Sequence, residues 1–302
     1  MIYSNLKDYF LSKKNHYIFL FKLKLSRFGF YDYKLLKEKL DPLWNLRIEE
    51  VLLCPDNEFI DRVPNAGTLK NGIQIMHNGV KICAGGYYGA GIAQMLIKNK
   101  GVHEPQEELA FSQVLESLPI NSIMIELGAY WSFYSLWFKK VCYQGKNYMI
   151  EPEKKNIEYG KQNFIINNQK GFFLNAYVSD KTEVINNNQY ICVDDFIENY
   201  NIDYLHILHA DIQGYELNML KGAKRAIKNN KIAYIFISTH GSEIHKLCEA
   251  FLKKYNYKIL CEANPIESFS YDGLIVAKSK DFIGVEKINI SKNKLKLYDK
   301  VF

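Results

Sequence analysis

The chain has 302 residues, of which 48% are hydrophobic and 24% are charged. These values are typical of a globular protein with a sizeable core and exclude a disordered or fibrous chain. The net charge of +6 comes from lysines spread along the sequence. That pattern indicates a solvated surface that would also suit a phosphate-bearing small substrate, and we expect no nucleic-acid partner.

The cysteines and the N-terminus narrow the cellular setting. Six scattered cysteines include no CxxC pair, which excludes the usual zinc spacing and a secretory disulfide framework. The apolar run at residues 16–21 is too short to span a bilayer. Asp8 and the missing small-residue cleavage site argue against a signal peptide. We expect a cytoplasmic protein without a transmembrane segment.

The first 85 residues are predicted to form a unit of their own. Residues 1 to about 70 look helical and irregular, with a helical period over residues 33–46. Residues 72–85 predict a hairpin, because Asn78-Gly79 lies between two β-rich runs. We expect this extension to lie on the side of the main domain where a substrate binds, or to form a homodimer contact. Its basic stretch at residues 17–30 leaves membrane or partner contact open.

A glycine-rich stretch, residues 85–91, opens the second predicted domain, residues 86–302. It lacks the GxxxxGK[ST] pattern of a phosphate-binding loop, so we interpret it as a turn or a lid beside the substrate.

Strands and helices alternate from about residue 104 onward. This order predicts an α/β fold with a doubly wound, Rossmann-like, mostly parallel sheet. The last two predicted strands have no helix between them, which indicates an antiparallel edge. The predicted strands are 123–127, 148–150, 172–178, 190–193, 205–210, 232–238, 257–261 and 274–277, and the predicted helices are 106–118, 133–141, 154–167, a short one after Asp194-Asp195, 215–228 and one from 243.

In such a sheet, ligands bind outside the carboxyl ends of the strands. The first strand ends at Glu126, followed by Gly128, where no Cβ hinders a close backbone approach. The second ends at Glu151, an acceptor suited to two ribose hydroxyls. The third brings Tyr177 to the expected adenine position, and the fourth ends at Asp211.

The loop after the first strand distinguishes between nucleoside cofactors. The GxGxxG fingerprint is missing, because Ala129, Tyr130 and Trp131 follow Gly128. The acid at Glu126 would repel a pyrophosphate but tolerate a sulfonium with an amino-acid ammonium. These residues therefore favour S-adenosylmethionine over NAD.

Three motifs resemble the FkbM-type class I methyltransferases. They are Glu126 with the following LGAYWSFYS, the strand end Glu151-Pro152, and the DIQGYE segment at 211–216. The Asp194-Asp195 pair in CVDDFI also matches the family. The resemblance covers about residues 100–278, and it departs at Ser132, where the family usually has glycine. It implies a seven-stranded methyltransferase sheet and methyl transfer from S-adenosylmethionine, usually to a hydroxyl of a sugar or polyketide-like product.

Methyl transfer to a hydroxyl requires removal of the oxygen's proton, and we expect His240 and Asp211 at the catalytic centre. A histidine titrates near neutral pH and suits a general base, while the carboxylate would orient it or take the proton itself. We expect Gln213, Glu216 and Tyr88 to contact the substrate. His206 and His209 are predicted to be core or supporting residues. Asp211 and His240 offer two metal ligands without a convincing third, so we expect no metal.

The predicted function is therefore an S-adenosylmethionine-dependent O-methyltransferase acting on a sugar hydroxyl. The acceptor would be a carbohydrate or a nucleotide sugar, and bacterial surface-polysaccharide (capsule) biosynthesis is the expected setting. Two alternatives stay open: a nicotinamide-dependent oxidoreductase on a doubly wound fold, and a non-catalytic homologue that binds the cofactor.

Overall fold

The computed structural model describes residues 30–292. The predicted basic stretch at residues 17–30 lies almost wholly outside them, and so does the rest of residues 1–29. Within the described residues, no helix has the length and apolar character needed to cross a membrane.

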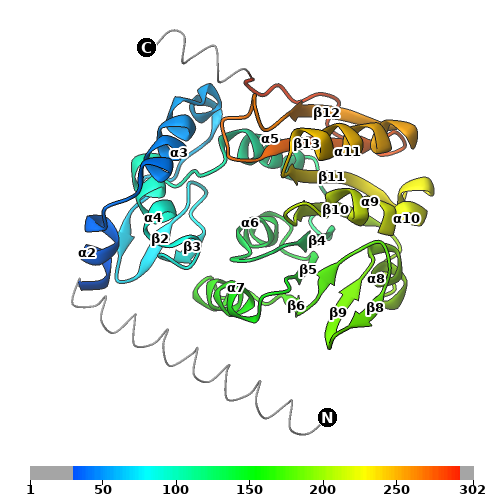
Figure 1. Cartoon of the computed structure of the whole chain (residues 1–302), viewed down its shortest axis with the longest axis horizontal. Helices are drawn as coiled ribbons and strands as arrows, with labels where there is room; N and C mark the ends of the chain where they lie inside the picture. Colours follow the sequence, from blue (N-terminus) through cyan, green and yellow to red (C-terminus); the bar gives the residue numbers. More distant parts are fainter. Residues whose placement is uncertain (1–29, 293–302) are drawn as a thin grey trace, which may run out of the picture.

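A central sheet of seven strands organises the chain (Figure 1). The strands are β4 (Ile123–Leu127), β5 (Lys146–Ile150), β6 (Phe172–Leu174), β10 (Leu205–Asp211), β11 (Ile232–Thr239), β12 (Tyr257–Ala263) and β13 (Gly273–Ser279). Their order across the sheet is β12-β13-β11-β10-β4-β5-β6. The pairs from β11 through β10, β4 and β5 to β6 are parallel, whereas β13 is antiparallel to both neighbours. The predicted seven-stranded sheet with an antiparallel edge is confirmed.

Helices cover both faces of this sheet, because successive strand residues point to opposite sides. Met124 packs in one core with α5 (Pro105–Glu116), α6 (Phe133–Val141) and α7 (Lys154–Ile166). Ile125 packs in the other core with α8 (Val193–Asn199), α9 (Glu216–Gly222), α10 (Lys224–Lys228) and α11 (Ser242–Lys254). Two buried cores, one on each face, make this a doubly wound α/β fold.

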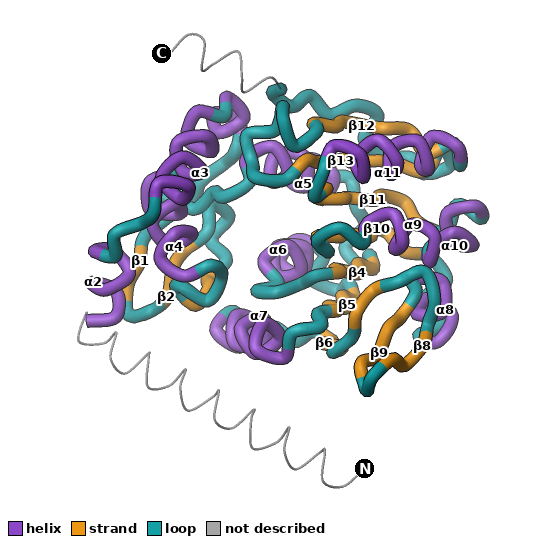
Figure 2. Tube along the Cα trace, viewed as in Figure 1, coloured by secondary structure: helices purple, strands orange, loops and turns teal. Residues whose placement is uncertain are grey.

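The N-terminal part of the described chain forms a smaller unit at one side of the sheet (Figure 2). It contains α2 (Phe30–Lys37), α3 (Pro42–Leu53), the 3₁₀ turn η1 (Pro55–Phe59), β1 (Leu69–Lys70), β2 (Ile73–Ile75), β3 (Lys81–Cys83) and α4 (Gly89–Lys98). β2 and β3 pair antiparallel, as the Asn-Gly turn predicted. β3 docks on α7, where the backbone N–H of Cys83 donates to Asn163 Oδ1 at 2.7 Å and that of Lys81 to Asn167 Oδ1 at 3.0 Å.

The structure corrects three predicted elements, each for a local reason. The helical period over residues 33–46 belongs to two helices, because Pro42 cannot continue a helix and Asp41 caps the second one. The strand over 172–178 divides into β6 and β7 (Tyr177–Val178), since the Asn175 amide donates to the backbone oxygens of Glu151 and Pro152. β7 then joins a separate three-stranded sheet with β8 (Glu183–Ile185) and β9 (Asn188–Ile191).

The helix predicted over 215–228 is the third correction. It breaks at Ala223 into α9 and α10. The carboxylate of Asp194 caps the second piece, accepting the N–H groups of Arg225 and Ala226 at 2.8 Å each. A side chain from α8 thus satisfies donors that a continuous helix would have used internally.

Candidate active site

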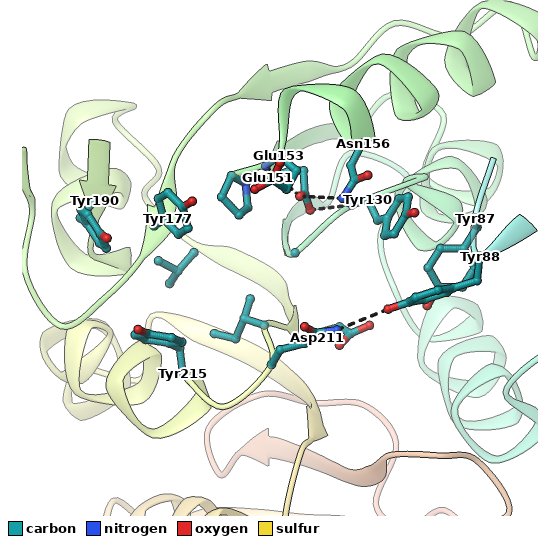
Figure 3. Close-up of a pocket in the computed structure, with 15 residues that line it drawn as sticks. Tyr87, Tyr88, Tyr130, Glu151, Glu153, Asn156, Tyr177, Tyr190, Asp211 and Tyr215 are labelled. Carbon is teal, nitrogen blue, oxygen red and sulfur yellow. Dashed lines mark hydrogen bonds between the residues drawn. The ribbon is translucent and has the colours of Figure 1, made fainter. Parts of the chain in front are cut away.

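A cavity of about 420 Å³ lies at the carboxyl ends of β4, β5 and β10 (Figure 3). Its size falls in the usual range for small-ligand sites. Figure 3 shows Tyr177 and Tyr190 at one end, Tyr87 and Tyr88 at the other, and Glu151 and Asp211 between them. The lining residues are Tyr87, Tyr88, Gly128, Tyr130, Glu151, Pro152, Glu153, Asn156, Tyr177, Val178, Tyr190, Asp211, Ile212, Gln213 and Tyr215.

Glu151 is held rigidly where β5 ends. Its Oε2 accepts the backbone N–H of Tyr130 at 3.1 Å. Its Oε1 accepts the N–H of Glu153 at 3.0 Å and the Asn156 amide at 3.1 Å. Burial raises the pKa of this carboxyl, although the three hydrogen bonds act to lower it. An ionised carboxylate has about four acceptor positions, so Glu151 retains capacity for a ligand hydroxyl.

Aromatic rings close both ends of the cavity. Tyr177 and Tyr190 stack with centroids 5.1 Å apart and planes at 21°. At the other end Tyr87 meets Tyr130 edge to face at 4.8 Å. Tyr88 adopts a left-handed backbone with φ +42° and accepts a hydrogen bond from the Gln213 amide at 3.3 Å. Such rings supply flat apolar faces for a base or a sugar.

Gly128 allows β4 and β10 to meet closely in the cavity wall. Its φ is +73°, and a Cβ there would overlap the backbone oxygen of Asp211. The backbone at Gly128 can therefore lie close both to the neighbouring strand and to the cavity. Only glycine allows this, because it has no Cβ.

His240 lies among three carboxylates beside the cavity. Its Nδ1 is 2.5 Å from Glu216 Oε1, and its Nε2 is 3.3 Å from Asp211 Oδ1 and 3.4 Å from Asp272 Oδ1. Burial alone would lower the pKa of His240, but these acids raise it to about 10. Burial raises the pKa of Asp272 to about 7. At neutral pH His240 is therefore a cation, which donates hydrogen bonds and accepts no proton.

Besides His240, four predicted site residues do not line the cavity. Ala129 and Trp131 are buried, and Trp131 stacks on Tyr87 at 4.4 Å with planes 9° apart. Glu126 accepts the Ser135 N–H at 3.2 Å, and burial raises its pKa to about 7. Glu216 is fully buried and reaches the site through His240.

The other predicted site residues, seven in number, do line the cavity. They are Tyr88, Gly128, Tyr130, Glu151, Tyr177, Asp211 and Gln213. Of the other two strand histidines, His209 is buried with its Nε2 2.7 Å from Glu107 Oε1, and His206 Nδ1 accepts the N–H of Ile123.

Sequence reasoning missed Asp272, Asn156 and Tyr190. Asn156 follows Glu151 by five residues at the start of a helix, a position from which a reach back to the strand end is foreseeable. Tyr190 stood in a predicted strand, but only the separate small sheet brings it to Tyr177. Asp272 lies before β13 in a loop without any pattern. Among residues 30–292, no group of three or more His, Cys, Asp or Glu side chains is arranged to hold a metal ion.

The sequence of the strand and helix segment around this cavity matches a known family. The model described as the methyltransferase FkbM domain matches residues 177–259. Over these residues the chain is similar to the FkbM methyltransferase domain. The matched segment includes Tyr177 and the Asp211–Glu216 motif and ends before Asp272. The FkbM resemblance expected from the sequence is confirmed. No curated protein matches the sequence significantly.

Solved structures resemble the chain at low identity. The FkbM methyltransferase of Methylobacillus flagellatus shares 21% identity over 54% of this chain and 44% of its own, with a TM-score of 0.44. TrmK of M. capricolum, in complex with S-adenosyl-homocysteine, shares 14% over 57% and 69%, with a TM-score of 0.40. An rRNA methylase of Streptococcus thermophilus shares 9% over 58% and 96%, with a TM-score of 0.41. The match thus spans less than half the length of the first structure.

The match to a methyltransferase domain supports S-adenosylmethionine, the cofactor that the sequence predicted. Numbered from β4 as strand one, the sheet order becomes 3-2-1-4-5-7-6, the order of class I methyltransferases. The cavity fits such a cofactor. It has a carboxylate with acceptor capacity at Glu151, an open backbone at Gly128 and aromatic faces at Tyr177 and Tyr190.

Proposed function

We propose that the protein is an S-adenosylmethionine-dependent O-methyltransferase that methylates a sugar hydroxyl. The observation that carries the proposal is the fixed carboxylate of Glu151 in a cavity that also contains Asp211. One acid suits the ribose of the cofactor and the other faces the space where an acceptor hydroxyl would lie. Bacterial surface-polysaccharide biosynthesis is the setting that we propose for it.

In this proposal, one set of residues binds the cofactor and another takes the proton of the acceptor. Glu151 would accept the ribose hydroxyls, with Tyr177 and Tyr190 beside the adenine and the Gly128 backbone along the methionine part. When bound, S-adenosylmethionine supplies a methyl group on a positively charged sulfur. Most of the rate enhancement would come from positioning the acceptor oxygen in a site that excludes water.

Asp211 is the group that we propose takes the acceptor's proton. Its carboxylate lines the cavity, and its Oδ1 is 3.3 Å from the imidazolium of His240. His240 is already protonated at neutral pH and so would orient Asp211 rather than act as the base. This changes the expectation for His240 from general base to positioning residue.

The acceptor side combines acids with aromatic rings. Asp211 and Asp272 can accept hydrogen bonds from hydroxyls, and Tyr88 and Tyr271 offer ring faces for the C–H surface of a sugar. We propose that residues 1–85 form the acceptor-side unit and residues 86–302 the cofactor-binding domain. The homodimer contact and the cytoplasmic location stay predictions.

Calorimetric titration with S-adenosylhomocysteine and, separately, with NAD tests the proposal. We expect binding of S-adenosylhomocysteine with a Kd in the micromolar range and no binding of NAD. Binding of NAD alone would support the oxidoreductase alternative and overturn the proposal. Binding of S-adenosylhomocysteine, combined with unchanged turnover in Asp211→Asn, would exclude the proposed proton acceptor.

A further inference from the structure

Arg47 reaches the reaction site from α3, outside the sheet. The helix starts at the Asp41 cap, whose Oδ1 accepts the Trp44 N–H at 2.9 Å. Trp44 and Arg47 are three residues apart and therefore share a face of the helix. The Trp44 ring packs so tightly on Gly91 of α4 that a Cβ at Gly91 would overlap it. This contact fixes α3, and with it Arg47, against the glycine-rich stretch.

Three aromatic rings surround the Arg47 guanidinium. Its central carbon lies 5.1 Å from the ring centroid of Trp44, 5.5 Å from that of Tyr271 and 6.0 Å from that of Tyr88. The rings come from α3, the loop before β13 and the glycine-rich stretch. Cation–π contacts of this kind hold a guanidinium in place without using its N–H donors.

Those donors are unused by the protein. Within residues 30–292, Arg47 forms no hydrogen bond and no ion pair, and its Nε is buried without a partner. A guanidinium has five N–H donors in a planar fork that matches a carboxylate or a phosphate. A buried donor without an acceptor costs free energy, which an external acceptor would recover.

The guanidinium is also close enough to Asp272, an acid that contacts His240, for its charge to act on that carboxyl. Burial raises the pKa of Asp272, and the positive charges of His240 and Arg47 oppose that rise. At Glu104 burial also raises the pKa, but His103 and, to a smaller extent, Arg47 bring it below its ordinary value. Tyr271, one of its three rings, directly precedes Asp272, which contacts His240. Tyr88, another of them, lines the cofactor cavity. Arg47 is therefore on the acceptor side of the cavity.

We propose that the acceptor carries an anionic group, a carboxylate or a phosphate, which Arg47 binds while the hydroxyl lies at Asp211. This inference rests on the proposed function and names the acceptor class for the same site. The His240 imidazolium offsets only one negative charge among Asp211, Glu216 and Asp272. Without Arg47, this group of acids would therefore disfavour an anionic acceptor relative to a neutral one.

The test uses the full-length protein saturated with S-adenosylhomocysteine. Failure to bind S-adenosylhomocysteine overturns the proposed function and is seen before any acceptor is added. Glucuronic acid, glucose 1-phosphate and glucose are then titrated by calorimetry into the wild-type complex and into Arg47→Gln, Arg47→Lys and Arg225→Gln. Arg225 serves as the charge-matched control, because it pairs with exposed acids of α8 away from the cavity.

We expect one of the two anions to bind at least ten-fold more tightly than glucose. The choice between them identifies the anion as carboxylate or phosphate. Arg47→Gln should weaken that anion at least ten-fold, and Arg47→Lys should weaken it less, with glucose unaffected. Arg225→Gln should behave as the wild type. Absence of binding by both anions, or equal anion affinity in Arg47→Gln, overturns the proposal.

Discussion

The Nδ1 of His240 lies 2.5 Å from Oε1 of Glu216, a side chain that is fully buried. Glu216 Oε1 also accepts the N–H of Gly214, and these bonds keep the pKa of Glu216 below its ordinary value despite burial. The imidazole therefore has a permanent negative partner on one side and Asp211 on the other. This arrangement makes the histidine a fixed cation that organises the acids of the site.

The His240 ion pairs predict a specific pH dependence of stability. The folded-state pKa of about 10 exceeds the unfolded value near 6.5. The stabilisation is therefore fully present below about pH 6.5 and is lost as the pH rises towards 10. After allowance for solvent screening, we expect about 1–2 kcal/mol from this group. Urea unfolding of the wild type and His240→Gln at pH 6 and pH 9.5 measures it.

The free energy gap between these two proteins should be larger at pH 6 than at pH 9.5. Equal gaps would show that His240 is not protonated in the folded state, and Asp211 would then lose its positioning cation.

Gly128 and Gly214 allow a test of how much backbone crowding at the cavity wall costs, because they differ in crowding but not in the sign of φ. Both have positive φ, +73° and +92°, but a Cβ at Gly128 would overlap the Asp211 backbone oxygen, whereas a Cβ at Gly214 meets nothing within 4 Å. We expect Gly214→Ala to cost about 1 kcal/mol, from backbone conformation alone. Gly128→Ala should cost about 3 kcal/mol or more, because β4 and β10 must separate. Denaturant unfolding of both variants measures the two losses of stability. Equal losses would contradict the close approach of the Gly128 and Asp211 backbones.

Glu151→Gln tests the ribose contact that we assign to this strand end. The amide has one acceptor oxygen in place of two and no charge, so it cannot keep all three internal hydrogen bonds and bind a hydroxyl. We expect S-adenosylhomocysteine to bind about 10- to 100-fold more weakly, about 1.4–2.7 kcal/mol. Glu183→Gln, on the exposed strand β8, is the control. Calorimetry measures both, and wild-type affinity in Glu151→Gln would remove Glu151 from the site.

The fold and the strand-end residues were predictable because each depends on local sequence. The apolar runs of β4, β5, β10 and β11 end at Glu126, Glu151, Asp211 and Thr239, and a parallel sheet brings such ends to one edge. The FkbM motifs added the resemblance to that family, although the matched segment begins only at Tyr177. Hydrophobic periodicity and short motifs were therefore enough to predict the residues whose positions depend only on the sheet.

The residues that sequence reasoning missed depend on contacts between distant segments. Asp272 reaches His240 only because β13 inserts between β11 and β12. Arg47 lies in an extension whose packing no period predicts, and it reaches the site because Trp44 fits over Gly91. Trp131 was expected at the cofactor but packs flat on Tyr87 instead. A one-dimensional pattern carries no information on such pairings.

Ser132 is where the sequence departs from the FkbM motif that it otherwise resembles, and the structure gives a physical reason to expect glycine at this position. Ser132 has φ +59°, in the left-handed region, and it immediately precedes α6. Its side chain is fully buried, and its hydroxyl has no hydrogen-bond partner among the described residues. A side chain in this conformation costs about 1–2 kcal/mol, and a buried unpaired hydroxyl about 1–3 kcal/mol.

Ser132→Gly should therefore stabilise the protein. Glycine removes both costs but adds about 0.5–1 kcal/mol of chain entropy to the unfolded state, which leaves a net gain of about 1 kcal/mol or more. Ser132→Ala separates the two effects, since it removes the hydroxyl and keeps the backbone strain, so its gain should be smaller. Urea unfolding of the wild type and the two variants gives the order of their stabilities. If Ser132→Gly were the least stable of them, the buried hydroxyl would have to be satisfied and the serine would be stabilising the turn that carries Tyr130 into the cavity.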